Sequence, residues 1–143
     1  MMLRRVMLVG CLAIAFQGAA VAAPQANELG KAWPNAQDVS RNPRWHVYVF
    51  ERDGVRYIQI NDLRGHVHGA FATIDGAFLV LPMGSADMKT TSFGSSATSP
   101  AGETIYSDTT VVVRVAPQAN GHTVVIESST CTDPARCSEM GLR

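Results

Sequence analysis

The chain has 143 residues, a length that fits one folded domain and is short for two. Its 12 lysine and arginine residues are balanced by 12 aspartate and glutamate residues, so the formal net charge is +0. This balance, with no basic run between aromatic residues, gives no support for binding to nucleic acid or to an anionic membrane surface.

Residues 1–22 have the three parts of a secretory signal peptide. Arg4 and Arg5 form a positive start, residues 6–16 form an apolar core, and residues 20–22 (Ala-Val-Ala) form a small-residue cleavage site. We expect cleavage after residue 22. A short, alanine-rich signal of this kind is typical of bacteria, so the expected location is the periplasm or the outside of a bacterial cell.

A second type of export signal lies inside the same segment. The run Leu8-Val9-Gly10-Cys11 resembles a bacterial lipobox, in which the cysteine receives a lipid. The apolar stretch before Cys11 is short and the hydrophobic run continues past it, so we expect no stable membrane anchor. Lipidation of Cys11 stays the alternative.

Residues 23–43 have no regular apolar period and contain several prolines and asparagines. This composition predicts a flexible leader before a single folded domain that spans 44–143. Trp33 is the leader residue that we expect to dock on the domain, because burial of an indole can offset the ordering of a few residues.

Three hairpins are predicted in the domain, and they give an all-β fold class. Asp53-Gly54 and Asp75-Gly76 each stand between alternating apolar residues, the pattern of a type I′ turn. Asn120-Gly121 predicts the third turn. We expect an antiparallel meander of about six strands that closes as a small barrel or sandwich.

Each predicted turn fixes a register that can be checked for complementary pairs. The first turn places Glu51 opposite Arg56, a favourable pair of opposite charges, and the second places Thr73 opposite Phe78. The third turn places Arg114 opposite Glu127. Its apolar residues then share one face, namely Val111, Val113, Val115, Val124 and Ile126.

Between the second and third hairpins, residues 84–103 are rich in serine, threonine, glycine and alanine. We predict a long loop here, and long loops in small domains are either disordered or functional. A short helix over 85–89, capped by Ser85, is the alternative.

Two cysteines remain after removal of the signal, Cys131 and Cys137. Cysteine pairs in exported proteins are usually oxidised, and the turn-forming Asp133-Pro134 between them favours their approach. We therefore expect a disulfide that staples the C-terminal tail. The spacing fits neither a redox dithiol nor a common zinc motif.

The histidines are the candidate metal ligands. His66 and His68 are two residues apart, so on a strand they point to one side and can present two imidazoles to one metal. The register brings His46 near the same end of the sheet as a third ligand, and His122 is the remaining histidine. The alternative is an ordinary half-exposed pair, because no carboxylate in that strand orients an imidazole. No other cofactor is indicated.

Catalytic motifs are lacking in this sequence. Ser85, Ser92, Ser95 and Ser96 lie in the predicted loop without a nucleophile elbow or a Ser-x-x-Lys motif. The aspartates are turn residues, and there is no phosphate-binding glycine loop. We therefore expect no enzyme, and a small hydrolase that uses these serines is the last of three hypotheses.

The aromatic face of the first hairpin is the candidate binding surface. It carries Tyr48, Phe50 and Tyr57, to which Phe93 of the predicted loop is added. If exposed, such a face marks a binding site; the alternative is that it packs under a loop or a second sheet. The expected function is a non-enzymatic exported module that binds a protein or a component of the cell envelope. The alternative is a periplasmic metal-binding protein that uses the paired histidines.

Overall fold

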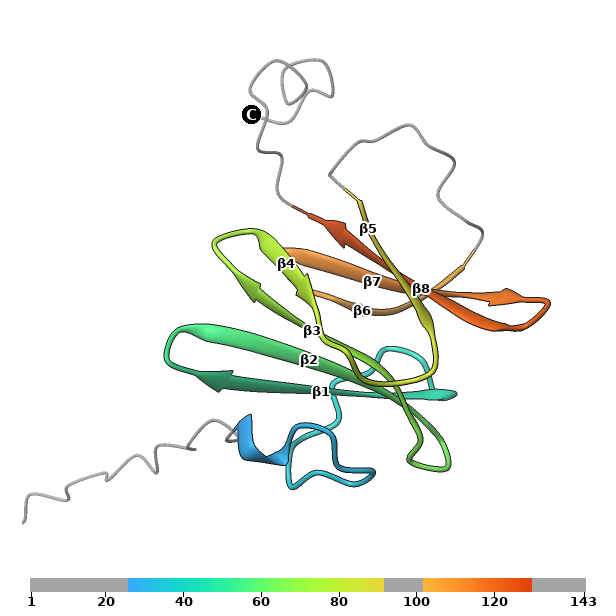
Figure 1. The fold of residues 1–143 in the computed structure, drawn as a ribbon, viewed down its shortest axis with the longest axis horizontal. Helices are drawn as coiled ribbons and strands as arrows, with labels where there is room; N and C mark the ends of the chain where they lie inside the picture. The colour runs from blue at the N-terminus through green and yellow to red at the C-terminus, as the bar shows by residue number, and fades with distance from the viewer. Residues whose placement is uncertain (1–25, 92–101, 130–143) are drawn as a thin grey trace, which may run out of the picture.

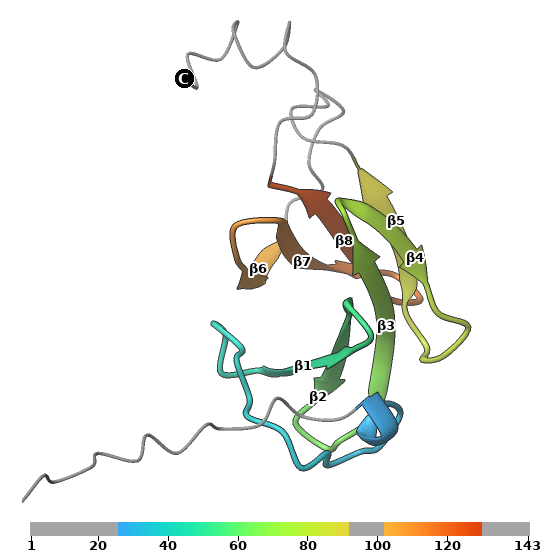
Figure 2. The ribbon, with the colours of Figure 1, turned by 90° about the vertical axis from the view of Figure 1, so that its left-hand side faces the viewer.

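The computed structural model describes residues 26–91 and 102–129. They form eight strands in two four-stranded sheets and no α-helix (Figures 1 and 2). The all-β prediction is confirmed. The expected antiparallel meander of about six strands is wrong, because the eight described strands form one antiparallel and one mixed sheet, and these strands form no closed barrel. The elements are η1 (Ala26–Glu28), β1 (Trp45–Arg52), β2 (Val55–Asp62), β3 (Val67–Ile74), β4 (Ala77–Val80), β5 (Asp87–Thr91), β6 (Glu103–Ser107), β7 (Val111–Gln118) and β8 (Gly121–Ser128). The described part of the chain contains no helix with the length and apolar character needed to cross a membrane.

Sheet A consists of β1, β2, β3 and β4 in chain order, each antiparallel to the next. Both Asp-Gly turns have positive φ at both central residues, including Asp53 at 53° and Asp75 at 49°, as a type I′ turn requires. The predicted registers of both hairpins are confirmed, with Glu51 opposite Arg56 in the first. Local turn chemistry is therefore sufficient to set this sheet.

Sheet B has the order β5-β8-β7-β6, and β5 runs parallel to β8. Both β5 and the start of β6 fall inside residues 84–103, so the prediction of one long loop there was wrong, as was the short helix over 85–89. Pairing with β8 outweighs the weak local preference of this polar segment, because strand formation depends more on neighbours than on composition. Residues 92–101 lie outside the described residues.

The third hairpin forms with a register that differs from the prediction by two residues. Arg114 lies opposite Val125 rather than Glu127, because the turn is at 119–120 and Gly121 is already the first residue of β8. A shift of two residues keeps every side chain on its face, so the predicted apolar face still lies in the core. Arg114 and Glu127 remain ion-paired as diagonal neighbours, with 3.6 Å between Nε and Oε2.

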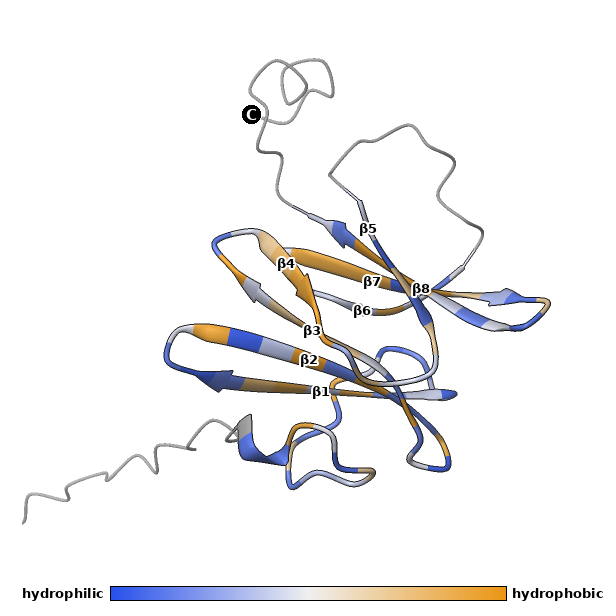
Figure 3. Ribbon diagram, viewed as in Figure 1, coloured by the Kyte–Doolittle hydropathy of each residue, from blue (hydrophilic) through white to orange (hydrophobic). Residues whose placement is uncertain are grey.

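The core lies between the two sheets and draws on both. Ile58, Ile60 and Phe71 of sheet A are fully buried with Val113 and Ile126 of sheet B. In Figure 3 apolar colour is concentrated on β7 and β4. The packing of these side chains decides which strand ends meet, and hence where a site can form between the sheets.

The leader makes specific contacts with sheet A in its described part. The buried side chain of Gln59 donates a hydrogen bond to the carbonyl of Lys31 (2.8 Å) and accepts one from the amide of Gly30 (2.6 Å). The amide of Val39 donates to the carbonyl of Val47 (2.9 Å). The segment predicted as a flexible leader is therefore tied to the sheet from Gly30 onward.

The aromatic face of the first hairpin is mostly covered. Tyr48 is 5% exposed and Phe50 is 0% exposed, while Tyr57 is half-buried. The prediction that Tyr48 and Phe50 form an exposed binding surface is therefore wrong. The alternative, that this face is packed against other parts of the chain, is right for these two residues. One cause is the leader, which forms a β-bridge from Asp38 to Tyr48 along the edge of β1. Phe93 lies outside the described residues.

Candidate functional site

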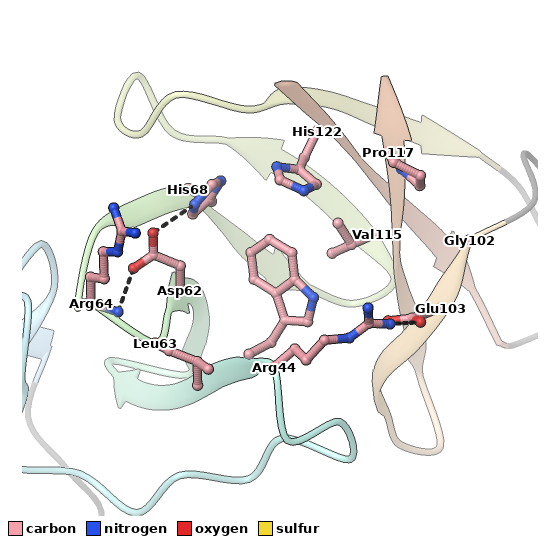
Figure 4. Close-up of a pocket in the computed structure, with 11 residues that line it drawn as sticks. Arg44, Asp62, Leu63, Arg64, His68, Gly102, Glu103, Val115, Pro117 and His122 are labelled. Carbon is pink, nitrogen blue, oxygen red and sulfur yellow. Dashed lines mark hydrogen bonds and ion pairs between the residues drawn. The ribbon is translucent and has the colours of Figure 1, made fainter. Parts of the chain in front are cut away.

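A cleft of about 740 Å³ opens between the two sheets, where β1 begins, β2 ends and β8 begins (Figure 4). Sheet A contributes Trp45, Asp62 and His68 to its lining, and sheet B contributes Val115 and His122. In Figure 4 His68 and His122 approach each other from opposite walls. Concave sites with an apolar lining and a few converging polar groups are the usual form of ligand sites.

Three aromatic rings of the cleft contact one another edge to face. The indole of Trp45 has ring-centroid distances of 5.0 Å to His68 and 5.1 Å to His122. The two imidazole centroids are 5.4 Å apart, with the ring planes inclined by 80°. Such perpendicular contacts are favourable pairings of aromatic quadrupoles, and Trp45 is only 8% exposed. The indole therefore forms a firm apolar wall behind both histidines.

His68 points into the cleft because β3 is irregular at this residue. Ile60 pairs with Gly69 and Asn61 pairs with Val67, so His68 has no partner on β2 and forms a β-bulge. Bulges re-aim side chains and are common beside functional sites. The carbonyl of His68 accepts a hydrogen bond from the amide of Ala86 (2.8 Å), so the β4–β5 connection supports the bulge from behind.

Asp62 orients the histidines at the rim of the cleft. Its Oδ1 accepts hydrogen bonds from the amides of Arg64 (2.8 Å) and His66 (3.0 Å), and its Oδ2 lies 3.3 Å from Nδ1 of His66 and 3.4 Å from Nε2 of His68. Desolvation raises the pKa of Asp62, but these hydrogen bonds outweigh it and lower the pKa to about 2. The ionised carboxylate thus lies within hydrogen-bond distance of both imidazoles, although Asp62 belongs to β2 and not to the strand of His68.

Charged groups at the mouth of the cleft are balanced. Arg44 forms an ion pair with Glu103 across the gap between the sheets, and both side chains are well exposed. Arg64 also lines the cleft, and its guanidinium forms no ion pair with any described residue. Leu63 beside it is 55% exposed. The mouth therefore offers one uncommitted cation next to an apolar rim.

The predicted metal triad does not assemble. His46 lies outside the cleft, where its Nδ1 is 2.7 Å from Oδ2 of Asp38 and its ring contacts those of Trp33 and Tyr48. The prediction that His46 is a third metal ligand beside His66 and His68 is therefore wrong, because its side chain lies on the outer face of sheet A. No group of three or more His, Cys, Asp or Glu side chains in the described ranges is placed to hold a metal ion.

Trp33 docks in the manner predicted, but only with part of its ring. Its indole covers Gly65 so closely that a Cβ there would lie 2.9 Å from Cε2, yet the side chain is 58% exposed. Cys131 and Cys137 lie outside the described residues, so their disulfide remains a prediction.

Sequence reasoning missed the groups that make the cleft. Trp45, Asp62 and His122 come from three strands, and each has an ordinary role by itself: the start of a strand, a turn aspartate and a lone histidine. A usable signal was the location of all three at strand ends that the registers place near one another. The β-bulge that aims His68 left no such signal, because it depends on the β4–β5 connection behind it.

Comparisons of the chain with protein-family models, with curated proteins and with solved structures give no match. The function is therefore argued from the cleft itself.

Proposed function

We propose that the chain is a non-enzymatic, exported binding protein that holds a small organic molecule in the cleft between its two sheets. The observation that carries this proposal is the cleft of about 740 Å³, backed by the buried Trp45 and lined on two sides by His68 and His122. The two sheets serve as a sandwich-like scaffold that presents the cleft at one end. Export to the periplasm or beyond follows from the signal peptide predicted over 1–22.

The lining favours a ligand with an apolar body and an anionic end. Leu63, Val115 and Pro117 present aliphatic surface next to the indole. Arg64 and His122 supply donors that no described residue occupies. A guanidinium recognises carboxylate and phosphate in a bidentate manner, so we expect a carboxylate or phosphate ester of a hydrophobic molecule, such as a component of the cell envelope.

A catalytic role has less support. Asp62 and His68 form a carboxylate–imidazole pair, but none of the residues that line the cleft is a serine, threonine or cysteine. A hydroxyl or thiol nucleophile would have to lie within hydrogen-bond reach of this base, and the carboxylates of the cleft already accept hydrogen bonds or form an ion pair. The pair therefore fits ligand positioning better than covalent chemistry.

Tryptophan fluorescence tests the proposal directly. A Trp33→Phe background leaves Trp45 as the remaining one of the 2 tryptophans, and a panel of hydrophobic carboxylates and phosphate esters is titrated into it. We expect at least one probe to give a saturable change in emission and a rise in Tm. Arg64→Ala or His122→Ala should each lower the affinity for that probe by about tenfold.

His46→Ala is the matched control, because it removes an imidazole outside the cleft and should leave probe binding unchanged. A panel with no effect on either emission or Tm would count against the proposal. Equal loss of binding in the His46 and His122 variants would do the same.

Metal binding by His66 and His68 is the second candidate, and a single observation favours it. Both imidazoles lie within 3.4 Å of the same oxygen of Asp62, so a rearrangement of side chains alone would be needed to turn this cluster of described residues into a metal site. Titration of zinc into untagged protein tests this candidate. We expect one bound ion that is lost in His66→Ala, and an absence of binding in the unaltered protein would dismiss it.

A further inference from the structure

Two imidazoles from different sheets lie at a separation that suits one shared ion. The ring centroids of His68 and His122 are 5.4 Å apart. An ion bonded in line to a ring nitrogen lies about 3 Å from the centroid, so two imidazoles at a trigonal angle have centroids about 5.2 Å apart. The observed separation is close to this value, so a shared ion requires the rings, now inclined by 80°, to rotate rather than the strands to move apart.

Each ring has a nitrogen that no described residue bonds. Nε2 of His68 lies 3.4 Å from the carboxylate of Asp62, which leaves Nδ1 for a ligand. Metal-binding histidines commonly have their second nitrogen held by a carboxylate in this way. The ring of His122 contacts those of Trp45 and His68, and among the described residues no hydrogen bond occupies its nitrogens.

The thioether side chain of Met88 lies beside a residue close in sequence to each histidine. Met88 in β5 is in register with Val124, two residues after His122. Its Sδ occupies the place that a Cβ would take on Gly69, the residue after His68. Glycine at this position is what allows the sulfur to approach β3, and Met88 is packed against the core rather than turned to solvent.

We propose that His68, His122 and Met88 bind one monovalent copper ion beside the cleft. Two neutral imidazoles and a thioether form a soft donor set, which favours copper(I) over zinc or calcium. Trp45 stands against both rings. Copper binding does not require the organic ligand proposed above, although His68 and His122 also line that cleft. The site shares His68 with the pair formed by His66 and His68 and differs from it in the use of His122 and Met88.

Competition with a chromophoric copper(I) chelator under anaerobic reducing conditions tests this site, with the full chain purified without an affinity tag. Silver(I) serves as a redox-inert probe in parallel. We expect one equivalent of copper(I) to be withdrawn from the chelator and Trp45 emission to be quenched. Substitution of His68 or His122 by Ala, or of Met88 by Leu, should each weaken binding by at least about tenfold.

The control variant is His66→Ala, which keeps Asp62 and His68 and removes the imidazole used by the alternative pair. It should bind copper(I) within about twofold of the unaltered protein. Met88→Leu conserves volume and should fold normally. Unchanged copper(I) affinity in this variant would therefore overturn the proposal that the Met88 thioether is a ligand. Greater loss in His66→Ala than in His122→Ala, or no competition with the chelator at all, would also overturn the proposal.

Ring-nitrogen NMR gives a second measurement that does not depend on fluorescence. Addition of silver(I) should shift the signals of His68 and His122 and leave those of His46 and His66 in place. A shift confined to exposed His66 would contradict the site.

Discussion

The two ends of β2 carry opposite charges on the core-facing side, and these charges have partners in different sheets. Arg56, near one end, reaches across to sheet B, where it donates a hydrogen bond to the hydroxyl of Tyr106 (3.2 Å) and pairs with the carboxylate of Asp108. Asp62, at the other end, bonds within the described residues to the turn and the histidines that follow it in sheet A. Contacts between the sheets close one end, whereas local contacts leave the other end open as the cleft.

The closed end is a dense network around one carboxylate. Asp108 also accepts hydrogen bonds from the hydroxyl of Tyr106 (2.8 Å) and from the amides of Thr110 (2.7 Å) and Val111 (2.9 Å). Burial opposes ionisation, but these donors and Arg56 hold the pKa of Asp108 well below its ordinary value. Burial and the adjacent carboxylate raise the pKa of Tyr106 to about 12.

At the open end the sheets meet through the aromatic contacts of His122 and through exposed polar pairs. The Arg44–Glu103 ion pair crosses the cleft, but its side chains are 65% and 45% exposed, and exposed pairs contribute about 0–1 kcal/mol. Polar groups that bond across the sheets stabilise the fold. In the proposed function, the polar groups that bond locally are the ones left to contact a ligand.

Removal of the central carboxylate is the most severe test of this division. Asp108→Ala should lower the free energy of unfolding by about 3 kcal/mol, because it leaves Arg56 and several donors without their acceptor. Urea denaturation measures the loss. The control is Asp87→Ala, which removes an exposed carboxylate of β5 whose ion-pair partner among the described residues is exposed Lys89. A loss below about 1 kcal/mol would mean that the closed end is not a main source of stability.

The backbone behind the cleft should matter more than the cleft side chains do. A Cβ on Gly84 would overlap the carbonyl of His68, and the residue has φ +92°. Gly84→Ala should therefore cost about 2–3 kcal/mol and disturb the bulge that aims His68. Gly30→Ala is the matched control, with φ +90° and open space around it, and it isolates the cost of the backbone angle. Equal losses in the two variants would refute the role of the close approach.

Acid should weaken the closed end more than the open end. The folded-state pKa of Asp108 lies below the ordinary value of 3.8, so its contribution is present above about pH 4 and is lost as the pH falls toward the folded-state pKa. Urea denaturation between about pH 5 and 2 should show a smaller decline for Asp108→Asn than for the unaltered protein, by about 1 kcal/mol. Asp62→Asn, at a more exposed site, should have a smaller effect. The reverse order would contradict the comparison.

The smallest effect on stability is expected at the cleft wall. His122 is half-buried, and no described residue bonds to its ring nitrogens. His122→Ala should change the free energy of unfolding by less than about 1 kcal/mol, while it weakens binding in the cleft. Thermal unfolding and the fluorescence titration together check this separation. A loss as large as that of Asp108→Ala would show that the two ends are not distinct.

Much of the fold could be read from the sequence where local chemistry decides it. Both Asp-Gly turns and the sheet A registers that follow from them are as predicted. The Asn-Gly turn was less reliable, because Gly121 with φ 142° enters the strand instead of the turn. The strand β5 could not be predicted, since its partner β8 lies far along the chain and supplies the hydrogen bonds that a polar segment needs.

The candidate site was less accessible to sequence reasoning. His66 and His68 do lie beside one carboxylate, which comes from Asp62 on another strand end. They do not share one side of a strand as predicted, because His66 precedes β3 and is exposed, whereas His68 lies in the bulge and lines the cleft. His46 was misplaced because a register fixes a residue's neighbours without showing what covers each face. The leader lies on the outer face of sheet A, and its Asp38 carboxylate is hydrogen-bonded to the imidazole of His46 there.

The sequence by itself determined the β class, the tight turns and the apolar faces, because alternation and positive φ act between residues that are close in the chain. Tertiary structure alone decided that Trp45, His68 and His122 meet, since they belong to three strands in two sheets and one of them is aimed by a bulge. It also decided which end closes. A charge on β2 has no preference for a local or a distant partner until packing of the two sheets brings Asp108 within reach of Arg56.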